Sequence, residues 1–122
     1  MASAKALHKK FERAVALHSA NKFEKAIEAY RSILKKSPTY APALTNLGQA
    51  LRKVGKNNQA LEYYERATQV PDADFGAWFN LANLQLELKN LSSAEQSYQS
   101  ALELNSDFAP ASYQLGRLYL DR

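Results

Sequence analysis

The sequence contains no cysteine, which excludes disulfides, thiolate metal sites and cysteine nucleophiles. Only four glycines and four prolines occur among the 122 residues, so the chain is neither collagen-like nor of low complexity. No stretch approaches the ~18 consecutive apolar residues that a membrane-spanning helix needs, and no membrane partner is expected. The first residues lack an apolar segment followed by a small-residue cleavage site. We therefore expect no secretory signal and a cytoplasmic location.

What the sequence does contain is an internal repeat with a period of 34. Alanines and tyrosines recur at this spacing without insertion or deletion, namely Ala26, Ala60 and Ala94, and Tyr30, Tyr64 and Tyr98. The repeat predicts a single domain over residues 1–122. Its parts are an N-terminal extension (1–6), three full repeats (7–40, 41–74 and 75–108) and the first helix of a partial fourth repeat (109–122).

Each repeat has the pattern of two amphipathic helices joined by a short break. In the second repeat Leu44, Leu47, Gly48 and Leu51 recur at i, i+3, i+4 and i+7, which is one apolar helix face. The pattern predicts helices near 5–20, 23–36, 41–54, 57–70, 75–88, 91–104 and 109–121.

Small residues at fixed places predict close contact between the two helices of a repeat. A single hairpin cannot bury both of its faces, so neighbouring repeats must stack. The predicted core is made of the repeated alanines and tyrosines together with Ala14, Gly48, Ala82, Gly116, Leu7, Phe11, Leu34, Leu102 and Leu115.

These spacings resemble the tetratricopeptide repeat. The second repeat carries the family's pattern as Leu44, Leu47-Gly48, Leu51, Ala60, Tyr64, Ala67 and Pro71, and the third as Trp78, Leu81-Ala82, Ala94, Tyr98 and Ala101. The resemblance implies an all-α fold, a right-handed α-solenoid of antiparallel helix hairpins with three full repeats and a final half-repeat helix. The pentatricopeptide repeat, which reads RNA, is the main alternative, but its period is usually 35.

Three departures from the family pattern are visible. Lys10 and Arg13 occupy the large-residue places of the first repeat, so its first helix is expected to pack loosely. Gln85 stands where the third repeat should have an aromatic residue or leucine, and Pro71 lies one residue early.

No constellation of catalytic residues can be assembled, so the chain is predicted not to be an enzyme and to hold no metal or cofactor. His8 and Glu12 could share a helix face, but we interpret His8 and His18 as solvated residues. Asp72 and Asp74 fit a turn or a helix cap better than acid–base catalysis. Trp78 falls on a core position, whereas Phe79 could contact a ligand.

The resemblance also implies a concave groove lined by the first helix of each repeat. Its predicted peptide-binding residues are Thr45, Asn46, Gln49, Arg52, Phe79, Asn80, Asn83, Tyr113, Gln114 and Arg117, with Phe11, Glu12 and Val15 in the first repeat. Five of these residues are amides, and each amide carries both a donor and an acceptor for a peptide backbone. Asn46 and Asn80, which lie one full period apart, are expected to form a ladder that is similar to the asparagine ladder of O-linked N-acetylglucosamine transferases.

A second family mode, the carboxylate clamp for chaperone C-terminal tails, is not expected. It needs lysines, an arginine and asparagines at defined places. In one frame these places hold Phe11, Val15, Asn46, Gly76 and Asn80. In the next frame they hold Thr45, Gln49, Asn80, Pro110 and Gln114. Only the asparagine survives in either frame.

The net charge of +4 is uneven along the chain. Residues 1–40 carry nine Lys and Arg and three Glu, whereas residues 75–108 carry one Lys and four acids. The basic residues fall between apolar helix positions, as on a solvated face. Phe11 is the one aromatic residue interleaved with them, whereas stacking of bases needs several. Nucleic acid is therefore not the expected partner, although an acidic partner or salt-sensitive head-to-tail association would fit.

The last predicted helix keeps apolar residues where terminal repeats are usually polar, notably Leu118, Tyr119 and Leu120. Ala111 and Leu115 are expected to be uncovered too, because the second helix of a complete repeat would normally pack over them. This predicts either a longer chain or self-association through the C-terminal helix. The function predicted from sequence is a non-catalytic scaffold that binds an extended peptide; the alternatives are a targeting or assembly module of a larger enzyme and an RNA-binding repeat.

Overall fold

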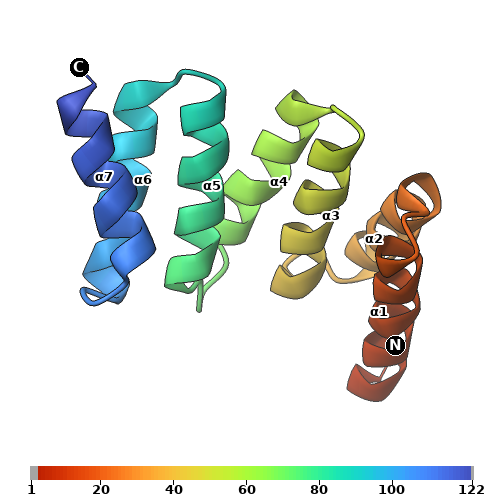
Figure 1. Ribbon diagram of the computed structural model, residues 1–122. Coiled ribbons are helices and arrows are strands. Elements are labelled where there is room, and N and C mark those ends of the chain that lie inside the picture. Colours follow the sequence, from red (N-terminus) through yellow and green to blue (C-terminus); the bar gives the residue numbers. More distant parts are fainter. Residues whose placement is uncertain (1–2, 122) are drawn as a thin grey trace. The chain divides into compact units, whose positions relative to one another are not determined.

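The computed structural model describes residues 3–121, and every regular element within them is an α-helix. The helices are α1 (Ala4–Ser19), α2 (Phe23–Lys36), α3 (Ala41–Lys53), α4 (Asn57–Thr68), α5 (Phe75–Glu87), α6 (Leu91–Leu104) and α7 (Ala109–Leu120) (Figure 1). All seven predicted helices are confirmed, with each end within two residues of the prediction. Residues 1 and 2 of the predicted extension and residue 122 of the half repeat lie outside the described residues.

The helices form two compact units, each described here by itself. The first runs to Ala67 and holds α1, α2, α3 and nearly all of α4; the second begins at Thr68 and holds α5, α6 and α7. In the first unit α2 packs against both α1 and α3, and in the second α6 packs against both α5 and α7. The single domain predicted from the repeat stays a prediction.

The turn inside each full repeat has the same backbone geometry. Asn21, Gly55 and Lys89, which occupy the same place in successive repeats, adopt positive φ angles of 61°, 81° and 66°. In the first turn the backbone N–H of Lys22 donates to the carbonyl of Leu17 at 2.9 Å, and equivalent bonds close the other turns at 2.8 Å. This is the Schellman ending of a helix, which glycine and asparagine adopt readily. The hairpin turn is thus repeated as faithfully as the core.

Helix starts also follow from local sequence. Pro42 and Pro110 lie in the first turns of α3 and α7, where the missing N–H is not needed by the helix. Asp74 is the N-cap of α5, and its Oδ1 accepts a hydrogen bond of 3.0 Å from the N–H of Ala77. The capping interpretation of Asp74 is therefore confirmed.

The repeated alanines and tyrosines form the core, as predicted. Ala26, Ala60, Ala94, Tyr30, Tyr64 and Tyr98 are buried, as are Ala14, Leu34, Gly48 and Ala82. At Gly48 the helices come so close that a Cβ atom would lie 2.5 Å from the ring of Tyr64. Glycine is favoured there because any side chain would collide with that ring unless the helices moved apart.

The predicted core needs correction at five places. Gly116 is exposed, and a Cβ atom added there would meet nothing within 4 Å, because no described helix packs against that side of α7. The other four residues are half-buried rather than buried, namely Leu7, Phe11, Leu102 and Leu115.

The prediction that α7 exposes its apolar residues is wrong for Ala111 and Leu118. Both are buried in the core of the second unit with Tyr98, because α7 turns this side towards α6. Tyr119 and Leu120 do remain exposed, at 50% and 86% of their surface. The apolar surface of α7 is therefore smaller than the sequence predicts.

The departures from the family pattern have local structural consequences. Ala14 is the buried residue of α1, while Lys10 and Arg13 are exposed, which fits the loose packing expected there. Gln85 on α5 accepts a hydrogen bond of 2.7 Å from the hydroxyl of Ser97 on α6. The polar Gln85 is thus tolerated between the two helices because a small polar residue faces it.

Candidate functional site

The predicted peptide-binding residues lie on the first helix of each repeat. Three of them are exposed, namely Gln49, Tyr113 and Arg117. The others are half-buried: Thr45, Asn46 and Arg52 on α3, Phe79, Asn80 and Asn83 on α5, and Gln114 on α7. Asn46 and Asn80 belong to different units, so their ladder stays a prediction.

Asn83 is held by the repeat tyrosine of its own hairpin. The hydroxyl of Tyr98, a fully buried residue, donates a hydrogen bond of 2.5 Å to the Oδ1 atom of Asn83. Burial raises the pKa of Tyr98 to about 12, so this hydroxyl remains a donor throughout the physiological range. Because the oxygen of Asn83 faces Tyr98, its two N–H donors remain for another acceptor.

Asn46 also interacts with a repeat tyrosine. Burial raises the pKa of the Tyr30 phenol, and a hydrogen bond with the side chain of Asn46 has a smaller, lowering effect on it. The same hydroxyl lies 3.1 Å from Nδ1 of His18. A buried tyrosine hydroxyl needs a polar partner. That requirement is the signal by which the sequence could have linked these tyrosines to the asparagines of the first helices, and it was missed.

The interpretation of His18 as a solvated residue is wrong. Its ring is half-buried and lies edge-on to Phe23 and Tyr30, with ring centroids 5.6 and 6.0 Å apart. The pKa of His18 is lowered from its ordinary value of 6.5, first by burial and second by the positive charge of Lys53. His18 is therefore a neutral hydrogen-bonding partner of Tyr30 at pH 7.

This lowered pKa predicts a pH dependence of stability. The contribution of His18 is complete above pH 6.5 and is lost as the pH falls through its folded-state pKa, because the unfolded chain then binds the proton more tightly. The loss is below about 1 kcal/mol, since solvent screens a partly exposed ring. Thermal unfolding of the wild type and of His18→Gln, compared across mildly acidic and neutral pH, should show a steeper decline for the wild type. Parallel slopes for the two proteins would refute the assignment.

The aromatic residues of the predicted site have two different environments. Phe79 packs against Phe108 and Tyr98, with ring centroids 4.9 and 6.0 Å apart, so its ring borders the core of the second unit. Trp78 is also half-buried beside this core. Tyr113 is 64% exposed, and the guanidinium of Arg117 lies 6.0 Å from its ring centroid. Of these rings, only Tyr113 offers an open aromatic surface for a ligand.

His8 and Glu12, which the sequence places on one helix face, do lie close together. Nε2 of His8 lies 3.2 Å from Oε1 of Glu12, and both side chains are largely exposed. Residues 3–121 contain no group of three His, Asp or Glu side chains that could hold a metal ion. None of the described helices is both long and apolar enough to cross a bilayer.

Comparison with known proteins gives matches along most of the chain. Two family models described as "Tetratricopeptide repeat" match residues 45–112 and 17–70. Tetratricopeptide repeat protein 21B of Xenopus laevis is 38% identical over 87 residues, which cover 71% of this chain. The probable UDP-N-acetylglucosamine–peptide N-acetylglucosaminyltransferase SPINDLY of Hordeum vulgare is 33% identical over 101 residues, covering 77% of this chain. The chain spans only 7% and 11% of the lengths of these relatives.

Among solved structures, the Yersinia enterocolitica type III secretion chaperone SycD in complex with a peptide of the translocator YopD is similar to this chain. The TM-score is 0.89 at 18% sequence identity, and the match covers 98% of this chain and 96% of that one. At this identity the likeness shows the shared all-helical fold.

Proposed function

Because the chain belongs to the tetratricopeptide repeat family, we propose that it is a non-catalytic scaffold that binds an extended peptide along the first helices of its repeats. The similar chaperone structure, which holds a peptide, supports this class of function. The proposed location is the cytoplasm, and the proposed partner is neither a nucleic acid nor a chaperone C-terminal tail.

The observation that carries the proposal is the fixed orientation of the amides. Asn83 accepts a hydrogen bond from the buried hydroxyl of Tyr98, which holds its side chain before any ligand arrives. Asn46 interacts with the hydroxyl of the buried Tyr30 in the first unit. An extended peptide presents alternating N–H and C=O groups, which amide side chains can match without reading the peptide's sequence. Fixing the side chains in advance reduces the entropy lost on binding.

Removing two of the predicted peptide-binding amides, one from each unit, should weaken binding without unfolding the chain. The double variant Asn46→Ala, Asn80→Ala is expected to lose affinity roughly thirtyfold, since each of the two lost hydrogen bonds contributes about 1 kcal/mol. Affinity purification with mass spectrometry would identify partner segments, and calorimetry with a synthetic segment would give the affinity.

The matched control removes two exposed amides from second helices, Asn58→Ala and Gln96→Ala. It should bind as the wild type does, and both variants should keep the helical circular dichroism signal. Equal affinity of the Asn46→Ala, Asn80→Ala protein and the wild type would contradict the role of the amides.

A targeting or assembly module of a larger enzyme is the second candidate. The match to a protein named as an N-acetylglucosaminyltransferase favours it. Both candidates require the same peptide binding by this chain. They differ in whether the source gene also encodes a catalytic domain, which its sequence would show.

A further inference from the structure

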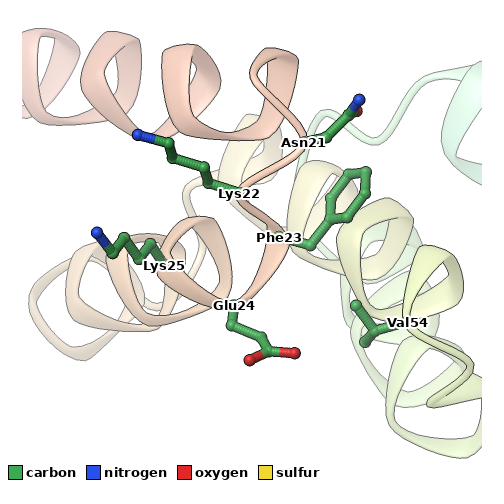
Figure 2. Close-up of a pocket in the computed structure, with 6 residues that line it drawn as sticks. All are labelled: Asn21, Lys22, Phe23, Glu24, Lys25 and Val54. Atoms are coloured by element: carbon green, nitrogen blue, oxygen red, sulfur yellow. The ribbon is translucent and has the colours of Figure 1, made fainter.

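The first unit has a pocket away from the predicted peptide-binding residues. It has a volume of about 390 Å³ and lies where the turn between α1 and α2 approaches the end of α3 (Figure 2). Its lining consists of Asn21, Lys22, Phe23, Glu24, Lys25 and Val54. Phe23 and Val54, both half-buried, face the same space and supply the apolar surface.

Positive charge gathers around this pocket. Lys22 and Lys25 line it, and Figure 2 shows their side chains extending to the side opposite Phe23 and Val54. Lys53 and Lys56 lie close to Val54 in the chain. All four lysines are exposed, and among residues 3–121 none of them forms an ion pair. Lys53 also lowers the pKa of His18, which shows that its charge acts on neighbouring groups. Glu24 is the one acid in the lining.

The excess of positive charge belongs to the first unit as a whole. Up to Ala67 the sequence has thirteen Lys and Arg and five Glu. From Thr68 onwards it has three Lys and Arg and seven Asp and Glu. An anionic partner is therefore attracted to the first unit and repelled by the second. Such complementarity guides association and determines which partner binds.

We propose that this pocket binds an acidic and aliphatic segment of the peptide partner. A carboxylate of the segment lies near Lys22 and Lys25 on one side of the pocket, and an aliphatic side chain farther along the segment packs against Phe23 and Val54 on the other side. This inference rests on the proposed function, because it names the chemistry of the peptide that the scaffold binds. The recognised groups are side chains, so a free C-terminal carboxylate is not needed.

A peptide fits this surface better than a single-stranded nucleic acid does. Bases need exposed aromatic rings on which to stack. Phe23 beside the pocket is half-buried and engaged edge-on with His18. The strongly exposed rings, Tyr113 and Tyr119, belong to the second unit, where acids prevail. The four lysines around the pocket and these open rings thus belong to different units.

Three fluorescein-labelled probes test the proposal by anisotropy. The acidic probe is a synthetic peptide of Glu, Leu and Ser blocked at both ends, the neutral probe has Gln for each Glu, and the third is a mixed single-stranded RNA. The variant Lys22→Gln, Lys25→Gln removes two charges from the pocket. The control Lys35→Gln, Lys36→Gln removes two exposed charges from the other end of α2.

The wild type should bind the acidic probe more tightly than the neutral probe, and added salt should weaken the binding. Lys22→Gln, Lys25→Gln should bind the acidic probe roughly fivefold more weakly, whereas the control should match the wild type. Glu24→Gln should bind it more tightly. Equal losses in the two double variants would overturn the proposal, since net charge alone would then explain them. Preference for the RNA over the acidic probe would also overturn it.

The outcomes separate this proposal from the proposed function. The pocket alone is refuted if both peptides bind with equal affinity and that affinity depends on Asn46 and Asn80 but not on Lys22 and Lys25. If neither peptide binds and no partner segment is captured, the peptide-binding function itself fails.

Discussion

Replacing Tyr98 by alanine is expected to destabilise the second unit by about 3–5 kcal/mol, the usual cost of removing a buried aromatic ring. Tyr98 is fully buried in the core formed by α5, α6 and α7. The alanines around it, such as Ala82 and Ala94, are too small to fill the space that the ring would leave. A cavity would therefore remain, and its surroundings would lose both contacts and the hydrogen bond to Asn83.

Chemical denaturation followed by the fluorescence of Trp78 measures this effect, because Trp78 is the only tryptophan and lies beside that core. Tyr98→Phe is the matched control, which keeps the ring and loses only the hydroxyl. It should cost about 1 kcal/mol and weaken peptide binding through the freed Asn83. A loss below ~1 kcal/mol for Tyr98→Ala would show that the ring does not hold the unit together.

Replacing Gly48 by glutamine is expected to destabilise the first unit by about 2–4 kcal/mol, because overpacking and an unpaired buried amide outweigh the gain in helix propensity over glycine. A Cβ atom at Gly48 would already lie 2.5 Å and 2.6 Å from two carbons of the Tyr64 ring. Tyr64 is 2% exposed, so its ring has little free space to move into.

Gly116→Gln is the matched control in the same place of the repeat. Nothing lies within 4 Å of a Cβ atom there, so only the helix-propensity gain remains, and stability should rise by up to about 1 kcal/mol. Thermal unfolding followed by circular dichroism would compare the two variants. Similar midpoints for both would show that the contact between α3 and α4 is not tight.

Ala82 indicates how much stability would be lost with a small side chain at Gly48. It occupies the same place on α5 and is fully buried near Tyr98. A methyl group is therefore acceptable in the second unit. Gly48→Ala should consequently be much milder than Gly48→Gln, since the helices need only a small separation to admit one methyl group.

The helices were predictable because the residues that define them recur with the repeat period. Alanine and tyrosine recur on the faces that meet, so both the helices and the central core residues followed from spacing. The turn residues Asn21, Gly55 and Lys89 share the period too, although Lys89 would not by itself suggest a positive φ angle. Its conformation is imposed by the hairpin around it.

The errors arose at residues whose burial depends on a neighbouring helix, which the repeat period does not specify. Gly116 matches Gly48 in the repeat, but the contact with a tyrosine exists only at Gly48, where α4 supplies Tyr64. Leu118 was assigned to the uncovered side of its helix, yet α7 turns it into the core of the second unit. The partial burial of His18 depends on Tyr30 and Phe23, which no local pattern connects to it.

The helices that carry the candidate amides were predictable, whereas the hydrogen-bond partner of Asn83 was not. The position of the amides on the first helices followed from the family resemblance. That Tyr98 holds Asn83 depends on a hydrogen bond between side chains of two different helices. Such bonds need the geometry of packed helices, which the sequence pattern alone does not specify.

The most direct test of peptide binding by the amides is an NMR titration that follows the side-chain signals of Asn46, Asn80 and Asn83. A synthetic segment of a captured partner is added to the isotope-labelled protein. We predict that all three NH₂ signals shift and saturate together as the segment binds, because these groups donate to its backbone. Saturable shifts elsewhere in the chain, with these three signals unchanged, would contradict it.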